Sequence, residues 1–273
     1  QPCIQIQRNW YNGYNVVTDI AVSGEGDIYV VGWTTGRLEN ANNSYEGNRD
    51  AFLAKLDLCQ FDPTNCNRGT LDDPASAAEW VVHLGGSNRD EALAVTVRRN
   101  GDPVIVGKTS SRDFPTHISG RDREDSDTPF DREDSVGNYD VSVNDPTNTN
   151  QYRGGSSDAF VTVVPADGRG VVSSYFLGGD QADAATDVAS SGASLYVVGH
   201  TASSEVVSPW GAVDGGPSSE DQDAFLFYQN PIPNRRDTGR ILGSSGNDQE
   251  ATAVDVIESS EQKSVVVVGN TEE

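Results

Sequence analysis

The sequence carries the stretch VTDIAVSGEGDIYVVGWT (17–34) and repeats its pattern in ALAVTVRRNGDPVIVGKT (92–109), ATDVASSGASLYVVGHT (185–201) and ATAVDVIESSEQKSVVVVGNT (251–271). Each copy has an alternating apolar segment, a short polar turn, and a β-branched run that ends in Val-Gly-x-Thr. Alternation with a period of two is typical of β-strands, and self-similarity along a chain indicates a repeat architecture. The sequence therefore predicts a run of related antiparallel strand pairs.

Two further elements recur with these pairs. Asp-Ala-Phe opens a strand in DAFLAKLDL (50–58), DAFVTVVPA (158–166) and DAFLFYQNP (223–231). A Gly- and Asp-rich turn follows a leucine in LGGSNRDEA (84–92), LGGDQADAA (177–185) and LGSSGNDQEA (242–251). Each repeat thus supplies four short strands, in the order D-A-F, L-G, A-x-x-V and V-V-G. We expect the D-A-F aspartates to hydrogen-bond to the neighbouring repeat once per unit; they are Asp50, Asp158 and Asp223.

Four short strands cannot bury both of their faces alone, so neighbouring units must stack face to face. The predicted fold is all-β: a β-propeller of four-stranded antiparallel blades, with about four blades in a single region, 1–273. The approximate units are 1–49, 50–157, 158–222 and 223–273. The extra length lies in loops, above all in an acidic insertion at 119–150 that contains Asp-Arg-Glu-Asp-Ser twice.

The D-A-F, L-G-G and G-D-x-Y-V-V-G-x-T strings, with SSRDFPT (110–116), resemble the SBBP-type β-propeller repeat family of exported bacterial and archaeal proteins. The resemblance covers nearly the whole chain outside the insertions and implies a fold more than an activity. The family is named for seven blades. With about four units here, the resemblance favours a partial propeller of a larger protein over a closed four-bladed ring. The absence of Met, even at position 1, also implies processing or truncation.

Charge limits the classes of partner. The formal net charge is −23, from 42 acidic and 19 basic residues, and such a surface repels nucleic acid and anionic membranes. Only three of the 19 basic residues are lysines, a balance expected of a protein kept soluble in salty water, or simply of an acidic surface. No apolar run approaches the roughly 20 residues that span a bilayer, so we expect no membrane insertion.

Cysteine usage bears on the compartment. Cys59 and Cys66 are separated by six loop-forming residues, a span that suits a local disulfide; the alternative is two reduced loop cysteines. Cys3 is left over, either free or paired elsewhere. A bridge would favour an oxidising, extracellular or cell-surface location. Asn42, in Asn-Asn-Ser, is a candidate N-glycosylation site.

Acidic side chains in the repeated turns either bind Ca²⁺ or cap the turns by accepting backbone N–H groups. The calcium candidates are Asp90, Glu91, Asp180, Asp183, Asp248 and Glu250. Their spacing matches no calcium loop, and capping is the preferred interpretation. We therefore expect no obligatory cofactor, with Ca²⁺ as the alternative.

The expected function is a non-enzymatic, extracellular or cell-surface scaffold for binding and assembly, which presents loops to other surface proteins, copies of itself or glycans. Trp33 and Trp210, next to the V-V-G strands or the loops after them, are the candidate contact residues. The alternative is a polysaccharide lyase or hydrolase with carboxylates near a central channel. Asp19 and Asp187 occupy matching positions and could serve, but Ala94 and Ala253 stand there in the other repeats.

Overall fold

The protein is all-β, as the alternation predicts. The computed structural model describes residues 13–56, 78–118, 151–209, 211–213, 221–229, 237–243, 246–259 and 262–271. Within these ranges the chain forms strands joined by turns and loops, without a helix. In this part of the chain, accordingly, nothing helical is long and apolar enough to cross a membrane.

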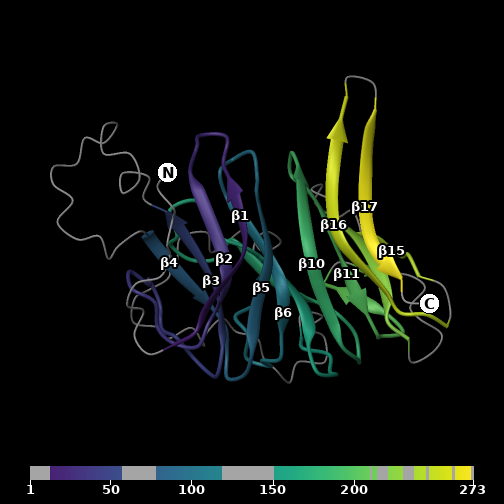
Figure 1. Ribbon diagram of the computed structural model, residues 1–273, viewed down its shortest axis with the longest axis horizontal. Helices are drawn as coiled ribbons and strands as arrows, with labels where there is room; N and C mark the ends of the chain where they lie inside the picture. The colour runs from purple at the N-terminus through teal and green to yellow at the C-terminus, as the bar shows by residue number, and fades with distance from the viewer. Residues whose placement is uncertain are drawn as a thin grey trace.

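Four antiparallel sheets follow one another along the chain and across the molecule (Figure 1). The first contains β1 (Asn15–Val22), β2 (Ile28–Thr34), β3 (Asp50–Leu56) and β4 (Ala78–Leu84). The second contains β5 (Asp90–Val97), β6 (Pro103–Thr109), β8 (Asp158–Val163), β9 (Ser173–Leu177) and the edge strand β7 (His117–Ile118). The third contains β10 (Asp183–Ser191), β11 (Ser194–Thr201), β14 (Asp223–Gln229) and β15 (Thr238–Ile241). The fourth has two described strands, β16 (Gln249–Glu258) and β17 (Lys263–Thr271); a separate hairpin joins β12 (Val206–Ser208) to β13 (Gly211–Val213).

The sheets pair the sequence elements in a constant order. Each of the first three runs from an A-x-x-V strand through a V-V-G strand and a D-A-F strand to the strand that ends in L-G. A sheet therefore combines the last two strands of one unit counted from D-A-F with the first two strands of the next. Tight turns join the first two strands, and glycines at positive φ (Gly26 at 93° and Gly101 at 90°) give two of these turns a backbone conformation that other residues adopt at a cost.

A β-bulge recurs at the same place in the first strand of every sheet. The register shifts between Val17 and Asp19 in β1, and at the matching positions of β5, β10 and β16. A bulge bends its strand and re-aims the side chains beside it. It also presses the preceding carbonyl oxygen against the glycine of V-G-x-T on the paired strand, so that an added Cβ at this glycine would overlap that oxygen.

Most of the hydrophobic core lies in layers between consecutive sheets, and a further cluster, which includes Leu38 and Phe52, covers the outer side of the first sheet. We call the side of a sheet that looks toward the next sheet its forward face, and the opposite side its backward face. The layer between the first and second sheets includes Tyr29, Val31, Val95 and Phe160. Equivalent layers lie between the second and third sheets and between the third and fourth. Strands β1, β5, β10 and β16 contact one another in succession, so the first strands of the sheets form a continuous inner row (Figure 1).

Candidate functional site

Each D-A-F strand begins with an aspartate buried at the corner of its sheet. Asp50 Oδ2 accepts the N–H of Glu46 at 2.7 Å, and Asp158 Oδ2 accepts the N–H of Arg153 at 2.7 Å. Each carboxyl therefore fixes the loop that precedes its strand to the first residue of that strand. The first glycine of L-G-G leaves room for the carboxyl, since a Cβ at Gly85 would lie 2.6 Å from Asp50 Cγ.

The expected bond from these aspartates to the neighbouring repeat is made instead by the main chain. The residue before each D-A-F aspartate accepts a hydrogen bond from the first residue of the next sheet. Donor–acceptor distances are 2.8 Å for Asp90 N to Arg49 O, 2.8 Å for Asp183 N to Ser157 O, and 2.6 Å for Gln249 N to Gln222 O. Sequence variation at Arg49, Ser157 and Gln222 is compatible with this link because it uses no side chain.

A second buried aspartate opens the inner strand of the second and third sheets. Asp183 Oδ2 accepts the N–H of Gly179 at 2.7 Å and the hydroxyl of Ser203 at 2.9 Å, while its Oδ1 accepts the hydroxyl of Thr201. The same network surrounds Asp90, with Gly86, Ser111 and Thr109 as donors. The two aspartates named as calcium candidates at these corners thus have their oxygens occupied by protein donors, in the manner of a turn cap.

Burial raises the pKa of both kinds of aspartate, those of D-A-F and those that open the inner strands. Desolvation is the main cause that raises the pKa of Asp50 and of Asp158 to about 8, and each also lies near a second carboxyl, Asp90 or Asp183. Desolvation likewise raises the pKa of Asp90 and of Asp183 to about 6, less far because three donors stabilise each charged form. Asp50 Oδ1 and Asp158 Oδ1 are buried without a hydrogen-bond partner among the described residues, which agrees with a carboxyl that stays protonated.

We expect Asp158 to make folding less stable as the pH rises. Its pKa is about 8 in the folded chain against an ordinary value of 3.8, so the folded state keeps a proton that the unfolded state loses. That contribution to stability is present below pH 4 and is lost as the pH rises through 8. Asp158→Asn, which imitates the neutral carboxyl, should reduce the fall in unfolding free energy between pH 5 and 8.5 by about 4 kcal/mol. Urea unfolding of both proteins across this range measures it, and equal pH slopes would contradict the assignment.

The two carboxylates of the enzyme alternative join neighbouring sheets. Asp19 Oδ2 accepts the N–H of Val95 at 2.9 Å, and Asp187 Oδ2 accepts the N–H of Val254 at 2.7 Å. The second oxygen of each accepts the N–H of the following residue in its own strand, at 2.8 Å in both cases. Each carboxylate therefore bridges the main chain of its own strand and that of the next sheet, which gives it a structural role.

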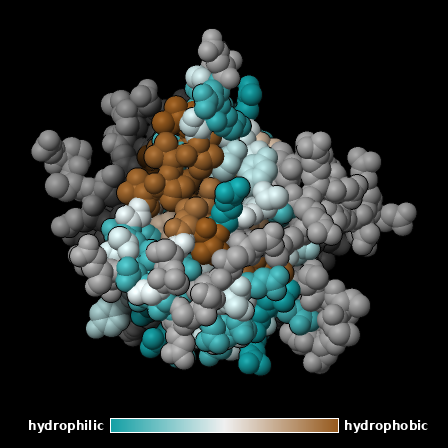
Figure 2. Space-filling model, turned by 90° about the vertical axis from the view of Figure 1, so that its right-hand side faces the viewer, coloured by the Kyte–Doolittle hydropathy of each residue, from teal (hydrophilic) through white to brown (hydrophobic). Residues whose placement is uncertain are grey.

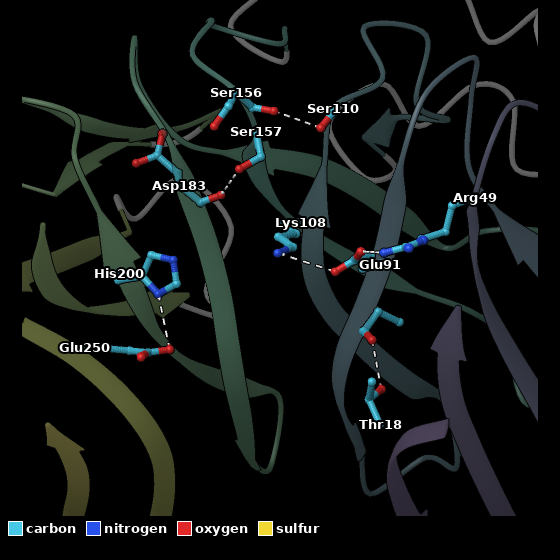
Figure 3. Close-up of polar contacts among 11 residues, drawn as sticks. Thr18, Arg49, Glu91, Lys108, Ser110, Ser156, Ser157, Asp183, His200 and Glu250 are labelled. Carbon is cyan, nitrogen blue, oxygen red and sulfur yellow. Dashed lines mark hydrogen bonds and ion pairs between the residues drawn. The ribbon is translucent and has the colours of Figure 1, made fainter. Parts of the chain in front are cut away.

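A row of mostly charged side chains crosses from the first sheet to the fourth (Figure 3). The Arg49 guanidinium lies 3.7 Å from the centre of the Trp33 ring and forms an ion pair with Glu91. Lys108 approaches the same carboxylate from the other side, with Nζ 3.4 Å from Glu91 Oε2. Trp33, a predicted contact residue, thus has an arginine stacked over its ring, and Glu91 pairs with two cations.

His200 and Glu250 continue this row between the third and fourth sheets (Figure 3). His200 Nδ1 lies 3.4 Å from Glu250 Oε1. Desolvation, together with the positive charge of Lys108, lowers the pKa of His200, while Glu250 opposes that shift. A neutral imidazole is therefore favoured at neutral pH, and the row carries two positive and two negative charges that compensate one another.

A shallow cavity of about 470 Å³ opens beside the turns of the second sheet. Its lining residues are Ser87, Asn88, Ser110, Arg112, Asp113, Tyr152, Gly155 and Ser156. Several of them bond to one another: Ser110 Oγ donates to Ser156 O at 2.8 Å, and Tyr152 OH donates to Gly155 O at 3.1 Å. The cavity offers one aromatic ring and several polar groups, a composition that suits a polar ligand.

The remaining site residues expected from the sequence do not gather in one place. Asp180 is exposed, and Asp248 accepts the N–H of Gln222 at 2.9 Å. Among the described residues, no group of three or more His, Cys, Asp or Glu is placed to hold a metal ion. Asn42 is exposed, but its side-chain amide donates to Gly168 O at 3.0 Å. The proposed disulfide of Cys59 with Cys66, the odd Cys3, and Trp210 lie outside the described residues.

Sequence reasoning missed Arg49, Lys108 and His200 as members of one row. A signal was available for the last two, since Trp33, Lys108 and His200 all occupy the variable position of V-G-x-T. No protein-family model matches the chain, and no curated protein matches it. Its function has therefore to be inferred from its own residues and their geometry.

Proposed function

We propose that this chain is a propeller-type scaffold, exported or on the cell surface, that acts by binding and assembly and not by catalysis. On this proposal its sheets are propeller blades arranged about the inner row of β1, β5, β10 and β16. The constant strand order of the first three sheets and the contacts between consecutive inner strands support the blade assignment. The repeat strings that resemble the SBBP-type family support it as well.

One observation carries the assembly function: the row of sheets exposes apolar residues at both ends. On β1, Ile20 and Val22 are 56% and 61% exposed, and on β17, Val266 and Val268 are 41% and 57% exposed. Figure 2 looks at the end that carries β16 and β17, where hydrophobic residues gather in one patch. Contiguous apolar surface of this kind marks interaction sites in soluble proteins.

The inner-row carboxylates and the cavity also fit a binding role. Asp19 and Asp187 hold neighbouring sheets together, so they offer no free acid and base for glycan cleavage. The polar cavity beside Arg112 and Tyr152 supports contact with glycans or with loops of other surface proteins.

We expect the chain to associate in a manner that depends on protein concentration and salt. Its net charge of −23 makes copies repel one another at low ionic strength, and salt screens that repulsion while leaving apolar contacts in place. Sedimentation velocity should show association at least ~10-fold tighter in 1 M than in 0.1 M NaCl. A chain that stays monomeric at millimolar concentration in both salts would contradict the assembly function.

A further inference from the structure

We propose that the forward face of the fourth sheet docks onto the backward face of the first sheet of a second copy of this chain, head to tail. This inference rests on the assembly function and names its contact surface. It follows from an interface that the chain already builds between each pair of consecutive sheets.

The forward faces of the first three sheets show what the fourth lacks. Two residues of each V-V-G strand point toward the next sheet, and they are Tyr29 and Val31, Val104 and Val106, and Tyr196 and Val198. All six are buried. Val266 and Val268 stand at the same two positions of β17, yet they are exposed. The fourth sheet therefore presents a forward face of the type that is covered by a neighbouring sheet elsewhere.

The backward face of the first sheet supplies the complementary half. In β5 the residues that pack backward are Ala92, Val95 and Val97, and in β16 they are Ala251, Val254 and Val256. Val17, Ile20 and Val22 hold these positions in β1 and are exposed. On β2 and β3 this face is already covered, since Val30, Phe52 and Leu56 are buried in one cluster with Leu38. The part of the face that is open to a partner is therefore that of β1. Leu38 packs on the backward face of the first sheet as Phe114 and Val206 do in the second and third.

Polar details of the inner strands agree with the same pairing. Thr18 Oγ1 donates to Val31 O at 3.3 Å and to Ala92 O of the next sheet at 2.8 Å, and Thr186 makes the same pair of bonds, to Val198 O and Ala251 O. Thr252 repeats the first bond, to Val268 O at 3.3 Å, and is exposed. In the docked pair its hydroxyl would reach the carbonyl of the partner copy's first strand that corresponds to Ala92 O, which is that of Val17.

Aspartate and alanine alternate at one position of the first strands, from sheet to sheet, and the proposed contact continues this alternation. At the contact of the second and third sheets, Ala94 faces a sheet whose own Asp187 holds the N–H of Val188. At the proposed contact, Ala253 would face a sheet whose own Asp19 holds the N–H of Ile20. The docked pair thus repeats an arrangement already present in the chain. The first and fourth sheets lie at opposite ends of the row (Figure 1), so these two faces do not meet within one chain. Because they match each other, the occupant of each is a second copy.

Asp255 is the unfavourable feature of this face. It stands where Ala21, Thr96 and Ala189 stand in the other sheets, and it brings a carboxylate to an apolar contact. Asp255→Ala installs the residue found in the first and third sheets, so it should tighten association by about 10-fold, and most strongly at low salt.

The decisive experiment mixes two variants of the full chain. Val268→Asp damages only the forward face and Ile20→Asp only the backward face, and both positions are exposed enough to accept the change without unfolding. In 1 M NaCl each variant alone should associate at least ~100-fold more weakly than the unaltered chain. Mixed together, they should form a one-to-one heterodimer through the two undamaged faces. Leu242→Asp, at an exposed apolar position directly after β15, is the matched control and should associate as the unaltered chain does.

The possible outcomes distinguish a failure of the head-to-tail contact from a failure of the assembly function. A heterodimer of the two variants, seen by sedimentation or native mass spectrometry, supports head-to-tail docking. Loss of association in Val268→Asp but not in Ile20→Asp would mean a symmetric contact between forward faces and would overturn the proposal. If both variants associate like the unaltered chain, assembly uses another surface, so the docking fails while the assembly function stands. Absence of association in the unaltered chain overturns both.

Discussion

Gly199→Ala is expected to destabilise the protein by about 3 kcal/mol or more, and to lower its Tm on the order of 10 °C. Gly199 is the glycine of V-G-x-T in β11, and it faces the bulge of β10. A Cβ there would overlap the carbonyl oxygen of Ala184 and lie 2.9 Å from both Ala185 Cα and the Phe225 ring. Backbone on one side and a buried ring on the other leave the methyl group no space, so the strand pair must move apart.

The control for this substitution is Gly24→Ala. Gly24 lies in an exposed turn with nothing within 4 Å of an added Cβ, so its replacement should change stability by less than ~0.5 kcal/mol. Gly107→Ala should reproduce the effect of Gly199→Ala, because the bulge of β5 brings the carbonyl of Glu91 to the same place. Thermal melting followed by circular dichroism measures all three. A Gly199→Ala protein that melts with the unaltered chain would mean that the bulge does not approach this strand.

The repeat pattern was sufficient to predict the strands but not how they group. Alternation in 17–34 and 92–109 gave the strand pairs, and the all-β class is confirmed. The grouping depends on which strands share hydrogen bonds, and β2 pairs with β3 across the long loop 35–49. Sequence spacing does not reveal such a pairing, because loop length has only a weak effect on the cost of closing a loop.

The site was predictable where a single residue type fixes the chemistry, and not where neighbours decide it. Asp90 and Asp183 were recognisable as turn caps because short acidic side chains beside glycine favour that role. The row through Arg49, Glu91 and Lys108 was hidden because its members come from separate segments of the chain, in two sheets. The exposed valines of β17 were hidden for a different reason, since their pattern in the sequence is the same as that of buried valines in the other repeats.

Asp183→Ala should destabilise the protein by about 3 kcal/mol at pH 7. Asp183 is fully buried and accepts three hydrogen bonds, from Gly179 N, Ser203 Oγ and Thr201 Oγ1. Its removal leaves one amide and two hydroxyls without their acceptor in the corner between the second and third sheets. Removing the carboxylate also removes the free-energy cost of placing a charge in a buried site. The cost of leaving three donors unsatisfied is larger, so the net effect is destabilising.

Two neighbouring substitutions make this expectation specific. Asp183→Asn keeps one oxygen for Gly179 and Ser203 and turns an amide toward Thr201, whose hydroxyl can accept, so it should cost less than ~1 kcal/mol. Asp180→Ala, only three residues away but exposed, should be neutral within ~0.5 kcal/mol. Urea unfolding at pH 7 gives the three free energies. If Asp183→Ala were as mild as Asp180→Ala, the buried network would not hold the corner, and the recurrence of Asp, Thr and Ser in the second and third sheets would need another cause.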